Sequence, residues 1–247
     1  MEQIPSNTPM MDAKPGPAGW LAVWIKVITK PGEQTFIDIT ETPEATSKTA
    51  FIWMFIVGTL SGMVQALLVG IRSLIGAAPQ FPIPGLEQFS QQSSNGGGIG
   101  SVLISFCASP IAGLLVVLFF ALGVAIIQWI AKLFGGTGTF EKSAYAFAAI
   151  SVPVSLVSLV LTLFSVIPFV GLCTGLISIG LSLYALFLQI TAIKAINRFG
   201  WGQAAGSVLI PSLVILFVCG CLVIGSLMLL GPMIGNVFSG INQSLAP

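Results

Sequence analysis

The sequence predicts an all-α integral membrane protein in which five transmembrane helices form a single bundle. Of the 247 residues, 55% are hydrophobic and only 7% are charged, whereas soluble domains average about 25% charged residues. The mean hydropathy is +1.00, and the charged residues lie in clusters separated by long apolar stretches. Each stretch is apolar on every face for about 20 residues or more, which indicates helices, because strands of a membrane barrel alternate apolar and polar positions.

The composition also excludes several classes of function. So few charged residues cannot cover a water-facing surface, which excludes a soluble enzyme and a disordered scaffold. The net charge of +1 gives no signal for binding nucleic acid. The sequence contains no histidine, which excludes His-based acid–base catalysis and imidazole metal sites. Its four cysteines form no CxxC motif, so we expect no metal site or cofactor.

The intervals between charged residues place the five spans. We expect them at about 49–75, 102–131, 143–166, 170–194 and 205–233. The third and fourth spans come from residues 143–193, which contain no charge and leave room for two crossings with a turn at Pro168 and Gly171. The membrane domain would occupy residues 49–238, preceded by a cytoplasmic segment (1–48) and followed by a short external tail (239–247).

The positive charges predict the orientation, because lysine and arginine in short loops mark the cytoplasmic side. A cytoplasmic N-terminus places one basic residue outside, Arg72, and eight inside: Lys14, Lys26, Lys30, Lys48, Lys132, Lys142, Lys194 and Arg198. With five spans, the C-terminus then lies outside.

The cytoplasmic segment contains a short apolar run at about 18–30, which we expect to be a helix. Trp20 and Trp24 could lie at the level of the lipid headgroups, or the helix could pack on the inner ends of the spans; the sequence favours neither. The acidic cluster that follows is expected to be a solvated linker, and its members are Glu33, Asp38, Glu41 and Glu44.

Polar and small residues within the spans predict how the helices pack. Gln65, Gln128 and Gln189 are the most polar residues there, and glutamine bonds between helices. We expect a packing role in which leucine could replace each of them; a substrate pathway is the alternative. Two pairs of glycines at four-residue spacing indicate close helix contact: Gly58 with Gly62, and Gly171 with Gly175.

Three stretches, read in order, resemble the Yip family of five-span proteins. They are ITKPGEQTFIDI near the N-terminus, GGTGTFEKSAYAFAAISVP from Gly135 to Pro153, and LSLYALFLQITAIKAINRFGWGQAAGSVLIP from Leu181 to Pro211. The resemblance covers roughly residues 24–230. It implies a five-helix membrane domain with a cytoplasmic N-terminus and without known catalytic residues.

The resemblance also implies a type of function. Eukaryotic Yip proteins interact with Ypt and Rab GTPases and act in vesicle trafficking. This chain lacks the Asp-Leu-Tyr-Gly-Pro type motif and is more similar to shorter prokaryotic members, so a small-GTPase partner is not expected. A prokaryotic plasma membrane is the expected location, or an endomembrane if the protein is eukaryotic. We therefore expect a non-enzymatic scaffold, adaptor or membrane-organising factor that contacts the bilayer and other membrane proteins or itself. A small permease or channel subunit is the alternative.

The expected partner-binding residues lie in the two cytoplasmic loops between spans. They are Gly135, Gly136, Gly138 and Phe140 in the first loop, with Lys194 and Arg198 in the second.

Overall fold

The computed structural model describes residues 17–74, 99–165 and 170–245, and in these ranges every regular element is a helix. Five helices are long and apolar enough to cross a membrane, which confirms the predicted fold class. They are α3 (Ser47–Leu74), α5 (Ile99–Leu133), α6 (Phe140–Phe164), α7 (Val170–Asn197) and α8 (Trp201–Leu245). Two shorter helices precede them, α1 (Pro17–Thr29) and α2 (Glu33–Thr40).

The helix bounds differ from the expected spans mainly at the last one. Helix α8 continues to Leu245, whereas the sequence led us to expect the fifth span to end near residue 233, with a separate tail after it. Pro110 and Pro153 lie inside α5 and α6 without ending either helix, because neighbouring helices and local adjustments can satisfy the freed backbone groups. Lys14 and Pro168 of the expected turn lie outside the described residues, whereas Gly171 of the expected turn is the second residue of α7.

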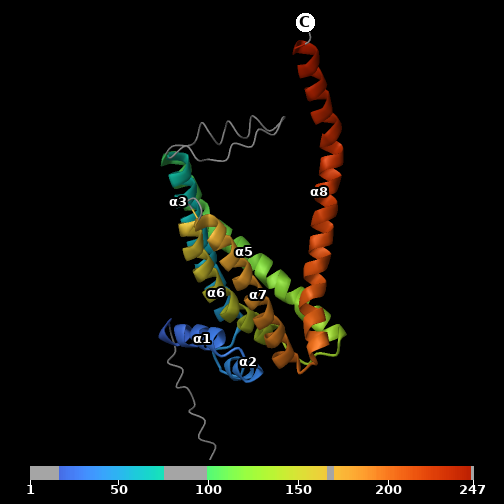
Figure 1. The fold of residues 1–247 in the computed structure, drawn as a ribbon. Helices are drawn as coiled ribbons and strands as arrows, with labels where there is room; N and C mark the ends of the chain where they lie inside the picture. Colours follow the sequence, from blue (N-terminus) through green and yellow to red (C-terminus); the bar gives the residue numbers. More distant parts are fainter. Residues whose placement is uncertain (1–16, 75–98, 166–169, 246–247) are drawn as a thin grey trace, which may run out of the picture.

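The long helices run alternately up and down (Figure 1). Helices α3, α5, α6 and α7 lie side by side, and α8 joins them through its first turns, where Ala204 and Val208 belong to the buried core. Helices α1 and α2 lie across one end of the bundle. We call this end, which also contains the connections 134–139 and 198–200, the capped end.

The expectation that the acidic segment after α1 is a solvated linker was wrong. Residues 33–40 form α2, which packs against α6 and α7. Phe36 and Ile39, three residues apart, are 0% and 3% exposed, while Asp38 lies on the outer face. Burying two such side chains contributes about 1.5–3 kcal/mol each, so the helical spacing of the apolar residues outweighs the acidic composition.

Helix α1 packs on the ends of the spans through its tryptophans. The rings of Trp20 and Trp24 make edge-to-face contacts with the buried Trp53 of α3, at centroid distances of 5.8 and 5.4 Å. Val27 is also fully buried. Helix α1 therefore packs on the ends of the spans with its tryptophans against the protein, while Leu21 and Ile25 of the same helix are 56% and 61% exposed.

Helices α3 and α5 approach closely along their length, at the glycines of α3. A Cβ atom built at Gly58 would lie 3.1 Å from Cβ of Val116, and one at Gly62 would lie 3.0 Å from Cβ of Ser109. Glycine spacing of this kind permits close backbone contact. In α7, a Cβ at Gly171 meets only the carbonyl of Ser165, at 3.3 Å, and one at Gly175 meets no described atom within 4 Å.

Replacing both Gly58 and Gly62 with isoleucine should force α3 and α5 apart. Overpacking of this kind costs about 1–3 kcal/mol per site, so the detergent-solubilised double variant should melt at a lower temperature. Gly175→Ile, on an exposed position, is the control that should leave the melting temperature unchanged. Equal melting of all three proteins would contradict close α3–α5 packing.

Candidate functional site

The two loops that the sequence singled out meet at the capped end. The connection between α5 and α6 contains Gly135, Gly136 and Gly138, and the end of α7 contributes Asn197 and Arg198. The backbone N–H of Gly138 donates a hydrogen bond to Oδ1 of Asn197 at 3.0 Å. The two loops therefore form one site, although they are far apart in the sequence.

Both α5 and α7 end in the same backbone motif. At the end of α5, Gly135 has a φ of 86°, and Gly136 N–H donates to the carbonyl of Ala131 at 3.0 Å. At the end of α7, Arg198 has a φ of 56°, and Phe199 N–H donates to the carbonyl of Lys194 at 3.2 Å. This six-to-one bond around a left-handed residue is the Schellman motif, which satisfies the last carbonyls of a helix.

At two positions of the first loop only glycine fits, because a side chain would collide with Asn197. A Cβ at Gly136 would lie 2.5 Å from Oδ1 of Asn197, and one at Gly138 would lie 2.7 Å from the same oxygen. Any larger residue would displace the Asn197 amide or the loop. Gly136 and Gly138 therefore let the α5–α6 loop lie directly against the end of α7.

A buried network of uncharged polar groups joins α5, α6 and α7 at this point. Gln128 Nε2 donates to the carbonyl of Gly138 at 2.8 Å and to Oδ1 of Asn197 at 3.0 Å. Its Oε1 accepts from the hydroxyl of Ser143 at 2.7 Å. Asn197 Nδ2 donates to the carbonyl of Ile193 at 3.2 Å. Gln128, Ser143 and Asn197 are each at most 3% exposed, so the network replaces the water that these groups would otherwise bind.

The hydrogen bonds of this network account for the packing of the helices, and they do not include the groups that catalysis by Ser143 would need. A serine nucleophile needs an adjacent base such as histidine or a carboxylate, but Ser143 donates to the amide oxygen of Gln128, which is not a base. No cluster of potential metal ligands occurs within the described residues. Sequence reasoning did not single out Asn197; its position next to a basic loop residue gave no signal of its role.

Gln128 bonds between helices, as expected of the glutamines in the spans, but its bonds to three other groups of the network argue against simple replacement by leucine. The other two glutamines lie elsewhere: Gln65 is exposed on α3, and Gln189 is half-buried on α7. Among the described residues, no hydrogen bond joins any two of the three glutamines, and nothing in that part of the chain favours the substrate pathway.

Lys194 is engaged with other residues of the protein. Its ammonium group lies 2.5 Å from Oε1 of Glu33 in α2 and 4.3 Å from the ring centroid of Trp201 in α8. The ring of Phe187 stacks on that of Trp201, with 6.0 Å between the two ring centroids. Lys194 thus ties α2, α7 and α8 together, and it is less available to a partner than its place in the sequence suggested.

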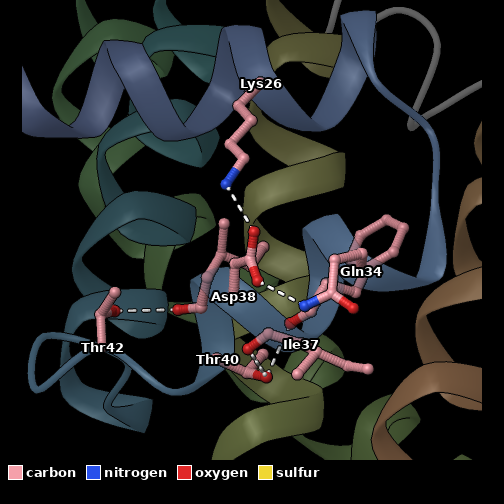
Figure 2. Close-up of polar contacts among 8 residues, drawn as sticks. Lys26, Gln34, Ile37, Asp38, Thr40 and Thr42 are labelled. Atoms are coloured by element: carbon pink, nitrogen blue, oxygen red, sulfur yellow. Dashed lines mark hydrogen bonds and ion pairs between the residues drawn. The ribbon is translucent and has the colours of Figure 1, made fainter. Parts of the chain in front are cut away.

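A second ion pair holds α2 against α1, as Figure 2 shows. Lys26 Nζ lies 3.1 Å from Oδ2 of Asp38, and Gln34 donates to Oδ1 of the same carboxylate at 2.8 Å. Burial disfavours the charged form of Asp38, but the hydrogen bonds from Gln34 and Lys26, with the charge of Lys26, hold the pKa of this carboxyl below its ordinary 3.8. Tyr184 of α7 adds a bond to the carbonyl of Ile28, at 2.6 Å.

The remaining groups at the site differ in their exposure. Thr137 and Arg198 are exposed, Gly138 is buried, and Phe140 is half-buried beside Phe51 at a ring distance of 6.4 Å. Arg198 makes no ion pair within the described residues. Thr139 is exposed as well, but its hydroxyl accepts a hydrogen bond from the N–H of Lys142 at the start of α6. Thr137 and Arg198 are thus the exposed polar side chains of the two connections best placed for a partner.

Leucine at position 128 should destabilise the bundle. It would remove the donor to Gly138 and Asn197 and the acceptor for Ser143, and leaving such buried groups unpaired costs about 1–3 kcal/mol. Gln65→Leu is the matched control, because Gln65 is exposed and α3 already presents apolar residues there. The first variant should melt earlier in detergent and the second should not; the reverse order would contradict a structural role for Gln128.

Comparison with known proteins identifies the family of the chain. Neither the curated proteins nor the solved structures contain a match. The Yip1 domain family matches residues 25–223, which include α2, both connections at the capped end and α8 as far as Val223. Because the match covers well over half of the 247 residues, the chain belongs to the Yip1 domain family.

Proposed function

We propose that this protein is a non-enzymatic scaffold or adaptor of the Yip type, which organises other membrane proteins or copies of itself from the capped end. One observation carries the proposal: the buried polar groups of the site satisfy one another, and the exposed Thr137 and Arg198 remain next to them. A rigid base under exposed groups suits recognition, since little order has to be gained on binding.

Arg198 is the cation best placed for such recognition. Its guanidinium can form a planar, two-pronged contact with a carboxylate or phosphate, and it is not neutralised by a described partner. Its left-handed backbone is set by the end of α7, so the residue is held by the helix rather than by a loose loop. We therefore place partner binding at Arg198 and Thr137, with Gly135, Gly136, Gly138 and Phe140 shaping the loop beneath them.

A photo-reactive amino acid in place of Thr137 tests the proposal in intact cells. It should give discrete adducts with a membrane protein, and the added change Arg198→Asn should weaken them several-fold. Asparagine tolerates the left-handed conformation, so the variant removes the charge without disturbing the loop. Lys30→Gln, which removes an exposed cation of the same end, is the control. Adducts that Arg198→Asn leaves unchanged would contradict the proposal.

The proposed orientation places the capped end in the cytoplasm. Seven of the eight basic residues assigned inside lie at this end, namely Lys26, Lys30, Lys48, Lys132, Lys142, Lys194 and Arg198, while Arg72 follows near the other end of α3. The eighth, Lys14, is outside the described residues. This distribution follows the rule that relates positive loops to the cytoplasmic side.

Cysteine labelling tests the orientation. An impermeant thiol reagent applied to intact cells should label Ser94→Cys, which lies outside the described residues, and Ser244→Cys near the end of α8. It should label Thr137→Cys only after the cells are permeabilised, because the α5–α6 connection would face the cytoplasm. Labelling of Thr137→Cys in intact cells, with Ser94→Cys silent, would reverse the orientation.

A further inference from the structure

An apolar groove runs between α5 and α8, near the capped end. It has a volume of about 520 Å³, which lies within the range of sites that bind small molecules. Every residue that lines it is apolar or aromatic; those that matter here are Ile126, Trp129 and Leu133 of α5 and Pro211, Val214 and Ile215 of α8.

The groove arises because α8 is fixed at its start and then diverges from α5 (Figure 1). Near its start, Trp201 lies under the ammonium group of Lys194, and a Cβ at Gly206 would be 3.5 Å from the ring of Phe134. Farther along, Val214 and Ile215 are 55% and 58% exposed although they face the groove. The two helices therefore enclose a wedge that narrows toward the capped end.

Within a bilayer this wedge must be filled, and the chemistry of its lining determines whether water, lipid or protein fills it. Water needs two to four polar partners to occupy a cavity, and the lining side chains offer no strong hydrogen-bonding group except the indole of Trp129. An empty groove would forfeit the dispersion contacts of its lining. A flexible acyl chain can follow a narrowing wedge, whereas a helix is a cylinder of about 10–12 Å.

A cation lies at the same level as the groove. Lys132 is exposed and forms no ion pair within the described residues. Lys132 lies three residues after Trp129 and directly before Leu133, so the three share one helical turn. Tryptophan is enriched where membrane and water meet. Basic residues between helices at this depth attract anionic lipid headgroups.

We infer that the α5–α8 groove binds one phospholipid, with an acyl chain along Trp129, Leu133, Val214 and Ile215 and an anionic headgroup at Lys132. Selectivity would come mainly from Lys132, because bulk lipid tails are as apolar as the groove and provide little preference for one lipid over another. The inference concerns the flank of the bundle. It does not depend on partner binding at Arg198.

A photo-reactive lipid tests this inference. The full chain is reconstituted into vesicles of equal parts phosphatidylglycerol and phosphatidylcholine, with traces of either lipid carrying a diazirine on one acyl chain. Labelled peptides should concentrate in residues 126–134 and 210–215. Ile215→Trp, which fills the groove, should lower this labelling several-fold. Leu216→Trp is the control, because Leu216 is 69% exposed on the next position of α8 but does not line the groove.

The headgroup contact has its own test, in a variant that leaves the packing intact. Lys132→Gln should reduce the preference for labelled phosphatidylglycerol over phosphatidylcholine about fivefold, while Lys48→Gln, at another exposed lysine of the capped end, should not. Melting temperatures establish that each variant is folded. Labelling spread evenly over the exposed faces of α5 and α8, an unchanged preference in Lys132→Gln, or groove residues cross-linked to a second copy would each overturn the inference.

Discussion

The end of a helix within or near a membrane leaves carbonyl and N–H groups that water cannot freely reach, and this constraint governs the capped end. Backbone Schellman motifs satisfy the last carbonyls of α5 and α7. In the connection, the side-chain amides of Gln128 and Asn197 bond to each other, to Ser143 and to the backbone of Gly138. Because each amide both donates and accepts, these two side chains of α5 and α7 satisfy groups of the connection and of α6 without introducing a charge. The position of α7 relative to α5 and α6 depends on this network.

The same network explains the glycines that drew attention in the sequence. Gly136 and Gly138 lie so close to Asn197 that a Cβ atom has no room, and Gly135 has the left-handed backbone that ends α5. They shape a compact connection and contribute no side chain to recognition. In the function that we propose, binding therefore falls to the exposed Thr137 and Arg198, which adjoin Gly138 and Asn197 of the buried network.

The sequence predicted the fold class and the five spans because these follow from composition and from the spacing of charges, which are local properties. Helix α2 was not predicted, because the acidic residues of this segment drew attention away from the helical spacing of Phe36 and Ile39, which are buried on one face. Nor could it reveal that Gln128 bonds to Asn197, 69 positions later. Such pairings depend on how helices are rotated against each other, and a single sequence gives no direct signal of that rotation. The two loops expected to bind a partner lie against each other in the structure, but the buried network between them was not predicted.

The basic residues that indicate orientation also have roles in the folded protein. Lys26 and Lys194 pair with Asp38 and Glu33 of α2, and acidic residues contribute little to the topology signal. Both lysines can thus favour the cytoplasmic side while the chain inserts and afterwards fix α2 across the ends of the spans. Exposed ion pairs of this kind each contribute about 1 kcal/mol or less, so the burial of Phe36 and Ile39 supplies most of the attachment. The ion pairs instead fix which way α2 faces, because its acidic residues must meet lysines on two different helices, α1 and α7.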